Sequence, residues 1–105
     1  MADTTDLLLK DSKVTDIIEL DLEDPQVLVI MKALSSNTRW KILEIIKQRL
    51  DVSQIAKKLS QTEANVSAQI KILEKANLTN PKYEAGRHGV RKFSQLNVAQ
   101  LIINI

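Results

Sequence analysis

Glycine placement is the feature that most limits the folds open to this chain. The 105 residues contain two glycines, and both lie in the stretch 85–89, between the segments 80–84 and 90–96. Because glycine adopts positive φ angles without strain, this placement predicts a β-hairpin with a five-residue connection over 85–89. The sequence therefore predicts a single, strongly signalled hairpin in its last third.

Apolar segments with capping residues precede this hairpin and predict four helices. Asp24 caps the first helix and Pro25 occupies its first turn, where the missing N–H costs nothing. The cluster 36–38 precedes the second helix, Ser53 is the expected N-cap of the third, and 60–62 leads into the fourth. The expected helices span residues 27–34, 39–49, 54–59 and 63–77.

The two ends of the chain have a different pattern. Residues 16–22 alternate, with Ile18, Leu20 and Leu22 on one face, and predict a short strand. The apolar stretch 100–105 is either a strand that pairs with 17–22 or the start of a short helix, and we favour the strand. Residues 1–13 lack a sustained period and are expected to form an acidic flexible arm. The remaining 14–105 form one domain.

Composition excludes several classes of protein. Without cysteine the chain has no disulfides, thiolate metal sites or cysteine nucleophiles, and a cytoplasmic location fits best. The longest uncharged apolar run is five residues, against about twenty for a membrane span, and the acidic start does not resemble an export signal. One histidine, no glycine-rich phosphate loop and no paired histidine–carboxylate spacing argue against an enzyme.

The distribution of charge indicates the kind of partner. The formal net charge is +2, but residues 1–24 carry eight acidic and two basic residues (net −6), whereas 25–105 carry thirteen basic and five acidic residues (net +8). A basic body suggests a polyanionic partner, because Lys and Arg displace condensed counterions from phosphates. The alternative is a merely solubilising surface. The arm is expected either to act as a solubilising tail or to compete with DNA for the basic body.

The order of these elements predicts an α+β, mostly α fold, a winged helix-turn-helix with the hairpin as its wing and extra strands at both ends. In this fold the second helix of the pair, here 63–77, enters the DNA major groove. With Val66, Ile70 and Leu73 facing the core, the opposite face carries small residues followed by lysines, which suit close approach to a duplex. An ordinary amphipathic core helix is the competing interpretation.

Three sequence motifs resemble one known family. The stretch 33–43 (ALSSNTRWKIL) is similar to the signature that opens the core of the ArsR-type winged-helix repressors, and 52–56 (VSQIA) and 66–78 (VSAQIKILEKANL) resemble two further motifs of that family. The similarity runs from residue 33 to about residue 93. It implies a homodimeric regulator of transcription, expected to be a repressor, that binds double-stranded DNA in a prokaryotic cell.

The resemblance also implies site residues, to which the charge pattern adds further cations. Ala68 and Gln69 stand where many relatives have Arg and His, so a strong base-reading side chain is missing. Asn65 and Gln69 are expected near the core flank of their helix, from which their amides reach adenine only if the helix is rotated. The expected DNA-binding residues are Thr62, Ala64, Asn65, Ser67, Ala68, Gln69, Lys71, Lys75, Arg87, His88, Arg91 and Lys92.

Dimerisation is expected at the two ends of the domain, where the apolar 101–105 replaces the C-terminal helix usual in the family. The expected interface comprises Val27, Val29, Ile30, Met31, Leu101, Ile103 and Ile105, together with 17–22. Closure of the protomer's own core by these segments is the alternative.

No cofactor, metal site, small-molecule ligand or membrane partner is inferred. The family's metal sensors use a Cys-x-Cys pair or Asp and His ligands, whereas this chain has no cysteine and one histidine, His88, expected as a polar residue at the wing tip. The alternative function is a winged helix that docks on protein, or an architectural module without sequence-specific DNA binding.

Overall fold

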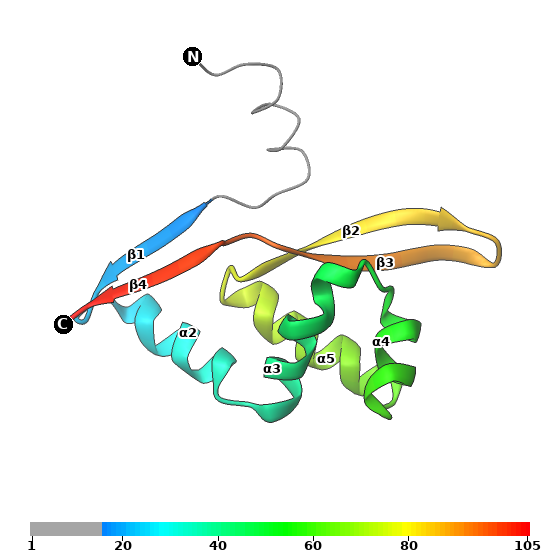
Figure 1. The fold of residues 1–105 in the computed structure, drawn as a ribbon, viewed down its shortest axis with the longest axis horizontal. Helices are drawn as coiled ribbons and strands as arrows, with labels where there is room; N and C mark the ends of the chain where they lie inside the picture. The colour runs from blue at the N-terminus through cyan, green and yellow to red at the C-terminus, as the bar shows by residue number, and fades with distance from the viewer. Residues whose placement is uncertain (1–15) are drawn as a thin grey trace, which may run out of the picture.

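The computed structural model describes residues 16–105, so the expected acidic arm, 1–13, lies outside the described residues. Figure 1 shows the helices on one side of a long β ribbon, in which β3 leads almost directly into β4. Four helices with a hairpin wing and extra strands at both ends confirm the expected winged helix-turn-helix. In chain order the elements are β1 (Ile17–Asp21), α2 (Pro25–Leu34), α3 (Asn37–Ile45), the 3₁₀ turn η1 (Ile46–Gln48), α4 (Val52–Leu59), α5 (Glu63–Lys75), β2 (Thr79–Gly86), β3 (Gly89–Leu96) and β4 (Gln100–Asn104).

Side-chain caps set where the helices begin. The Asp24 carboxylate accepts a hydrogen bond from the Gln26 N–H (2.9 Å) at the start of α2, as expected, and Pro25 occupies the first turn. The prediction that Ser53 caps α4 is wrong. Asp51 caps this helix instead, because its carboxylate and the Gln54 side chain satisfy two otherwise unpaired N–H groups reciprocally, at 2.8 and 2.9 Å.

Left-handed residues follow the ends of η1, α4 and α5, at Arg49, Ser60 and Asn77. The expected helix over 39–49 tightens into η1 after Ile45 and stops at Arg49, whose φ is +57°. Helix α5 ends at Lys75, two residues earlier than expected, because Asn77 adopts φ +61°. The Leu78 N–H then bonds the Leu73 carbonyl at 3.1 Å, which satisfies one of the last free carbonyls of α5.

The core lies between α2, α3, α4 and α5. The stripe predicted on the fourth helix, Val66, Ile70 and Leu73, is fully buried, which confirms the predicted inner face of α5. The buried cluster comprises Ile30, Ala33, Ile42, Ile55, Ala56, Val66, Ile70, Leu73, Ala76 and Leu78. Within residues 16–105, no helix is both long enough and apolar enough to cross a membrane.

Strands β2 and β3 form the predicted hairpin, but its turn is tighter than expected. The antiparallel pairing continues through Ala85 and Val90 to Gly86 and Gly89, so the connection contains two residues rather than five. Gly89 has φ +123°, which side chains rarely tolerate. A Cβ at Gly86 would lie 2.8 Å from the Gly89 carbonyl oxygen. Both glycines therefore serve the same close turn.

Strands β1 and β4 pair in parallel, from Ile17 with Gln100 to Asp21 with Asn104, which confirms the predicted C-terminal strand and its partner. Ile18 and Leu20 face the core as predicted. Leu22 does not face the core, and 53% of its surface is exposed. The chain turns after β1, where the Asp24 N–H donates a hydrogen bond to the Asp21 carbonyl (2.9 Å), and this turn carries Leu22 away from the core.

Candidate functional site

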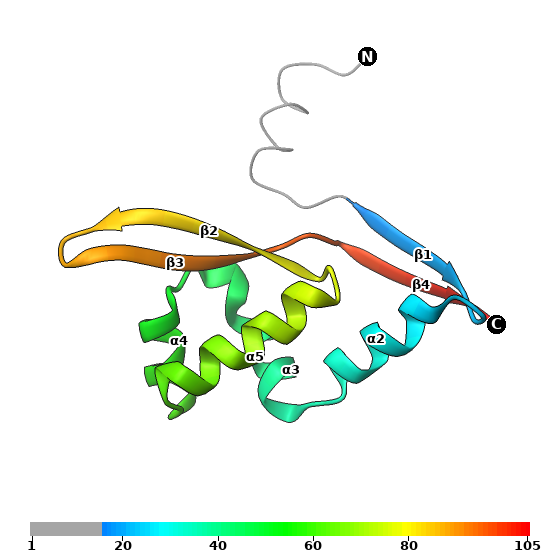
Figure 2. The ribbon, with the colours of Figure 1, turned by 180° about the vertical axis from the view of Figure 1, so that it is seen from behind.

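The outer face of α5 is open to solvent. Figure 2 shows α5 across the near side of the helical layer, with the wing extending past α4. Ala64 and Ala68 are exposed on the first two turns and Ser67 is half-buried, while Lys71 and Lys75 are exposed farther along. Thr62 caps the helix through a hydrogen bond from the Asn65 N–H (3.0 Å). Small side chains near the N-terminus, where unpaired N–H groups carry partial positive charge, leave room for an anion.

A chain of hydrogen bonds runs along the core flank of α5, where Asn65 and Gln69 were expected. The Asn65 amide donates to Gln61 Oε1 (2.7 Å), and the Gln69 amide donates to Asn65 Oδ1 (3.1 Å). Gln69 Oε1 in turn accepts from Arg39 Nη1 (2.6 Å). Both amides of α5 are therefore engaged within the protein.

Arg39 joins α5 to the end of α2. Its Nε donates to the Ala33 carbonyl (2.7 Å) and its Nη2 to the Lys32 carbonyl (2.9 Å). These carbonyls belong to the last turn of α2, where the helix has few acceptor partners of its own. The Lys32 carbonyl also accepts from the Ser35 N–H (3.2 Å) and hydroxyl (2.8 Å). The motif that contains Arg39 was recognised in the sequence, but its role was missed because all its partners lie on other elements.

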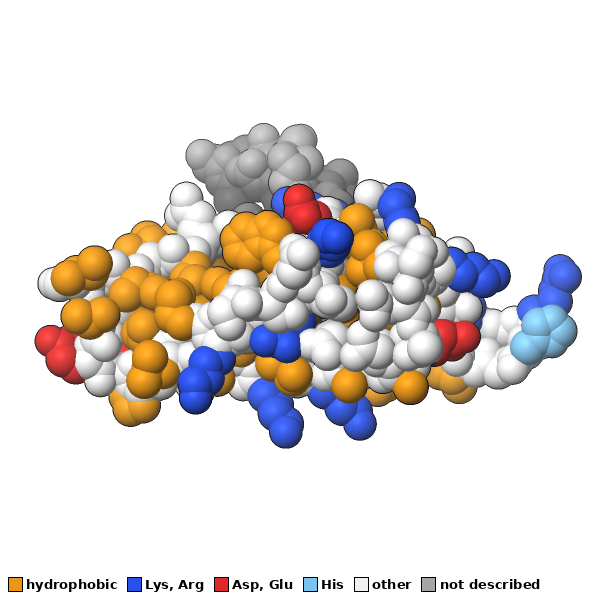
Figure 3. All heavy atoms as spheres, turned by 90° about the horizontal axis from the view of Figure 1, so that it is seen from below, with side chains coloured by type: hydrophobic (Ala, Val, Ile, Leu, Met, Phe, Trp, Pro, Cys, Tyr) orange, Lys and Arg blue, Asp and Glu red, His pale blue; other side chains and the backbone are white. Residues whose placement is uncertain are grey.

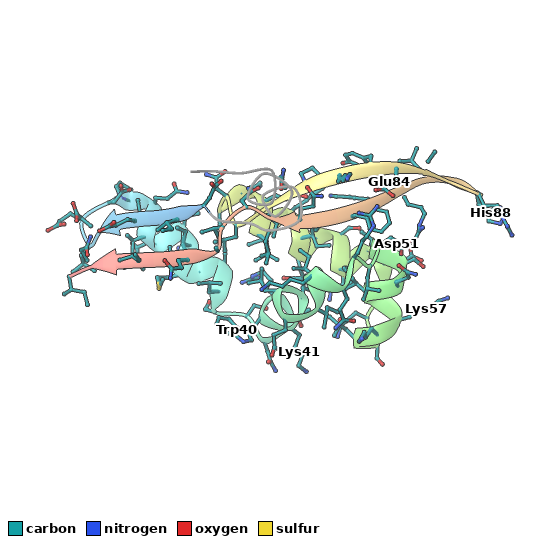
Figure 4. All side chains as sticks on the ribbon, turned by 45° about the horizontal axis from the view of Figure 1, so that its top comes forward. Trp40, Lys41, Asp51, Lys57, Glu84 and His88 are labelled. Carbon is teal, nitrogen blue, oxygen red and sulfur yellow. The ribbon has the colours of Figure 1, made fainter. Side chains whose placement is uncertain are left out.

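The wing places two of the predicted residues at its tip. Arg87 and His88 are exposed and form the turn between the two glycines. Figure 4 shows His88 at the far end of the hairpin, beyond α4 and well away from Trp40. The tip thus carries positive charge outward from the helical body.

The base of the wing is held by charged side chains around one aromatic ring. The Arg49 and Arg91 guanidinium carbons lie 5.2 and 4.8 Å from the Phe93 ring centroid. Arg91 Nε also donates to Asp51 Oδ2 (2.7 Å), and Arg49 pairs with Glu84. Burial alone would raise the pKa of Asp51, but hydrogen bonds from the Gln54 backbone and Arg91 outweigh it and hold that pKa below 3.8.

Lys92 is engaged on the other side of the wing. Its ammonium lies 3.3 Å from Glu74 Oε2 on α5, and both side chains are largely buried. Arg91 and Lys92, predicted with Arg87 and His88 as one basic cluster, are thus separated from the tip. They fasten the wing to the helices, a role that depends on Asp51 and Glu74 and that the local sequence did not reveal.

Apolar side chains gather at the opposite end of the molecule, over α2, β1 and β4, where orange atoms dominate in Figure 3. Of the residues expected at a dimer interface, Val29, Met31 and Ile105 are exposed there. Val27 and Ile30 are buried in the protomer's own core, because they lie on the inner side of α2, which corrects their expected place at a surface. Leu101 and Ile103 are half-buried. The apolar end comprises Ile17, Leu22, Leu28, Val29, Met31, Ile102 and Ile105.

A family comparison identifies this arrangement. The sequence model of the bacterial regulatory proteins of the arsR family matches residues 24–80, more than half of the chain. The chain belongs to the ArsR family. The match runs from the cap of α2 to the start of β2, so it includes the helix pair α4–α5 and Arg39.

Solved structures support the ArsR fold. The structure of the cadmium metal-sensor CmtR from Mycobacterium tuberculosis is 30% identical, with a TM-score of 0.53 over 69% of this chain and 72% of that one. Reduced HlyU from Vibrio cholerae is 24% identical, with a TM-score of 0.58 over 68% and 72%. The homodimeric winged helix-turn-helix domain of Mb0332 from Mycobacterium bovis is 21% identical, with a TM-score of 0.60 over 92% and 73%. Among curated proteins the comparison finds no match.

This ArsR-family chain differs from a cysteine-based metal sensor in its donors. It contains no cysteine. Among the residues that the structure describes, no group of three or more His, Cys, Asp or Glu side chains could hold a metal ion. His88, at the wing tip, has no second histidine to join it.

Proposed function

We propose that this ArsR-family chain binds duplex DNA as a sequence-specific homodimer and represses transcription. The observation that carries the proposal is the contrast among its cations. Arg91 and Lys92 form ion pairs within the protein. The ion pairs within residues 16–105 include neither Lys71 on α5 nor Arg87 at the wing tip. These cations project from the two elements that a winged helix presents to a duplex.

In this proposal α5 enters the major groove. Ala64 and Ala68 let its first turns approach the base edges, Ser67 positions the helix on a base or phosphate, and Lys71 and Lys75 reach the phosphate backbone. The wing places Arg87 on the adjacent backbone or in the minor groove. Gln69 acts as a positioning residue, because its amide is held by Arg39.

The apolar end supplies the dimer contact. Leu28 is 67% exposed and Met31 lies one turn away on the same helix, and such a surface is unfavourable in water unless it is covered. Two-fold pairing through this end would present two copies of α5 to half-sites about 34 Å apart. The homodimeric state of the similar Mb0332 domain supports this assembly.

Selection from a randomised duplex pool at near-physiological salt tests the DNA-binding proposal. We expect enrichment of a two-fold-symmetric site with steep salt dependence. Lys71→Ala and Arg87→Ala should each weaken binding and lower the salt slope by about one counterion. Lys47→Ala is the matched control, since this exposed lysine lies on η1 rather than on α5 or the wing.

The outcomes separate the alternatives. Weak binding without enrichment, and wild-type affinity in both variants, would contradict the proposal and favour a winged helix that docks on protein. Leu28→Asp with Met31→Asp should give a monomer by sedimentation and reduce affinity for the symmetric site. A reporter gene placed downstream of the enriched site tests repression, and activation of that gene would contradict it.

A further inference from the structure

Strands β1 and β4 form a ribbon of only two parallel strands. Within residues 16–105, no third strand pairs with either of them. Parallel strands normally lie inside larger sheets that are covered on both faces, and a two-stranded ribbon in water is marginally stable by itself. A further strand beside β1 or β4 would therefore stabilise the ribbon.

The stretch that contains β4 lacks the features that keep a strand edge from pairing with another chain. Such edges are usually protected by charged residues, proline or a bulge. The wing has this protection, with Pro81 and Lys82 on β2 and Arg91 on β3. By contrast, residues 98–105 contain no charged residue, no proline and no glycine. The edge of β4 therefore presents its backbone donors and acceptors without protection.

The edge of β1 differs from that of β4 in charge. Glu19 and Asp21 lie on β1, and Asn104 Nδ2 donates to Glu19 Oε2 (3.0 Å) across the ribbon. Two copies of β1 side by side would bring these carboxylates together, and like charges on neighbouring strands are destabilising. A second copy of the chain is therefore accommodated by β4 rather than by β1.

An apolar groove of about 550 Å³ borders the edge of β4. Gln100 and Leu101 both line it, although neighbouring residues of a strand point to opposite faces, so the groove includes the edge between these faces. Its other wall includes Trp40 and Leu43 of α3, and no residue of β1 lines it. The side of β4 away from β1 thus offers an apolar surface next to an unprotected strand edge.

We propose that β4 pairs with β4 of a second copy, antiparallel about a two-fold axis that passes near Ile102. The two ribbons then form one four-stranded sheet with the two β4 strands at its centre. An axis perpendicular to the sheet keeps the helices of both copies on the same side. Counted from Ile102, this pairing places the exposed Ile105 of each copy beside Ala99 of the other, at the groove.

This pairing rests on the proposed homodimer and specifies the backbone that joins its two copies. Ile102 and Ile105 belong to the apolar end already assigned to the dimer contact, so the strand pairing is continuous with it. Hydrogen bonds between the two β4 strands add direction to a contact that apolar side chains alone would leave less specific.

A single introduced thiol tests the geometry directly, because the chain contains no cysteine. Ile102→Cys in the full chain should give a disulfide-linked dimer on mild oxidation, since Cβ atoms directly opposite in an antiparallel pair lie about 4.5–5.5 Å apart. Ile17→Cys is the matched control, because Ile17 is also exposed but lies on β1. In the proposed sheet the two β1 strands are three strand spacings apart, about 14 Å, which is too far for a disulfide.

Amide hydrogen exchange on the wild-type protein avoids any effect of substitution on folding. In a two-stranded ribbon only alternate N–H groups of β4 point toward β1, whereas a strand between two others has all its N–H groups engaged. We therefore expect consecutive amides over 101–103 to be protected in the dimer. Alternate amides of this stretch should lose their protection when the protein is diluted to the monomer.

The outcomes separate this pairing from the proposed function. A protein that sediments as a dimer but forms no cross-link through Ile102→Cys, or protects only alternate amides of β4, would overturn the pairing and leave the homodimer intact. Equal cross-linking of the Ile17→Cys control would also overturn it, because random collision would then explain both disulfides. A wild-type monomer at high micromolar concentration would overturn the pairing and the homodimer together.

Discussion

Replacement of Arg39 by Ala should loosen the attachment of α5 to α2. The substitution removes three hydrogen bonds, to the Lys32 and Ala33 carbonyls and to Gln69 Oε1. A hydrogen bond to a charged group contributes about 1.5–3 kcal/mol, but water can replace part of each bond at this half-exposed site. We therefore expect the free energy of unfolding to fall by about 2–4 kcal/mol, which corresponds to about 10–20 °C in Tm for a domain of this size.

Urea unfolding of the full chain measures this loss, and two companion variants identify its source. Arg39→Lys keeps the charge but loses the planar fork, so it should recover less than half of the lost stability. Gln69→Ala isolates the bond to α5, and the cycle formed with Arg39→Ala should show a coupling of about 1 kcal/mol. Stability of Arg39→Ala within about 0.5 kcal/mol of wild type would refute the assigned role, since such a change is typical of an uninvolved surface residue.

Three further changes test other parts of the fold. Gly89→Ala should cost about 1–3 kcal/mol in urea unfolding, because its φ is +123°, whereas a cost near zero would contradict the strained turn. The lowered pKa of Asp51 means that its contribution is complete above pH 3.8 and is lost as the pH falls through the lower folded-state value. Asp51→Asn should therefore be less stable near neutral pH and flatten the loss of stability below about pH 4, and an unchanged acid profile would argue against the Arg91 contact. Ile70→Ala should cost about 2–5 kcal/mol by opening a cavity in the core, with Val90→Ala on the wing, where the side chain is 73% exposed, as the control that changes little.

Most of the helices and strands could be predicted from the sequence, because caps and apolar spacing within a short stretch of chain determine them. The cap at Asp24, the buried stripe on α5 and the pairing of β1 with β4 follow from side-chain type and spacing. The prediction was wrong where two nearby residues can cap the same helix. Ser53 is a good capping residue, but Asp51 with Gln54 satisfies two N–H groups instead of one and begins the helix earlier.

The candidate site was less predictable, because a cation's availability depends on what lies beside it in space. In the sequence, Arg87, Arg91 and Lys92 form one basic cluster. In the structure, Arg87 projects from the tip, while Arg91 and Lys92 pair with carboxylates 40 and 18 positions earlier in the chain, at Asp51 and Glu74. No short-range pattern encodes such partners. Val27 and Ile30 are likewise as apolar as their neighbours on α2, but they belong to the core because they lie on the inner side of that helix.

The parallel pairing of β1 with β4 has a consequence for the order of assembly. Gln100 follows its partner Ile17 by 83 residues, so the ribbon forms only after all the helices and the wing have been synthesised. Contacts of such long sequence separation form late in folding, after local helical contacts. The apolar end that would join two copies is therefore completed last, when Ile102 and Ile105 are added to the side chains of β1 and α2 that were synthesised earlier.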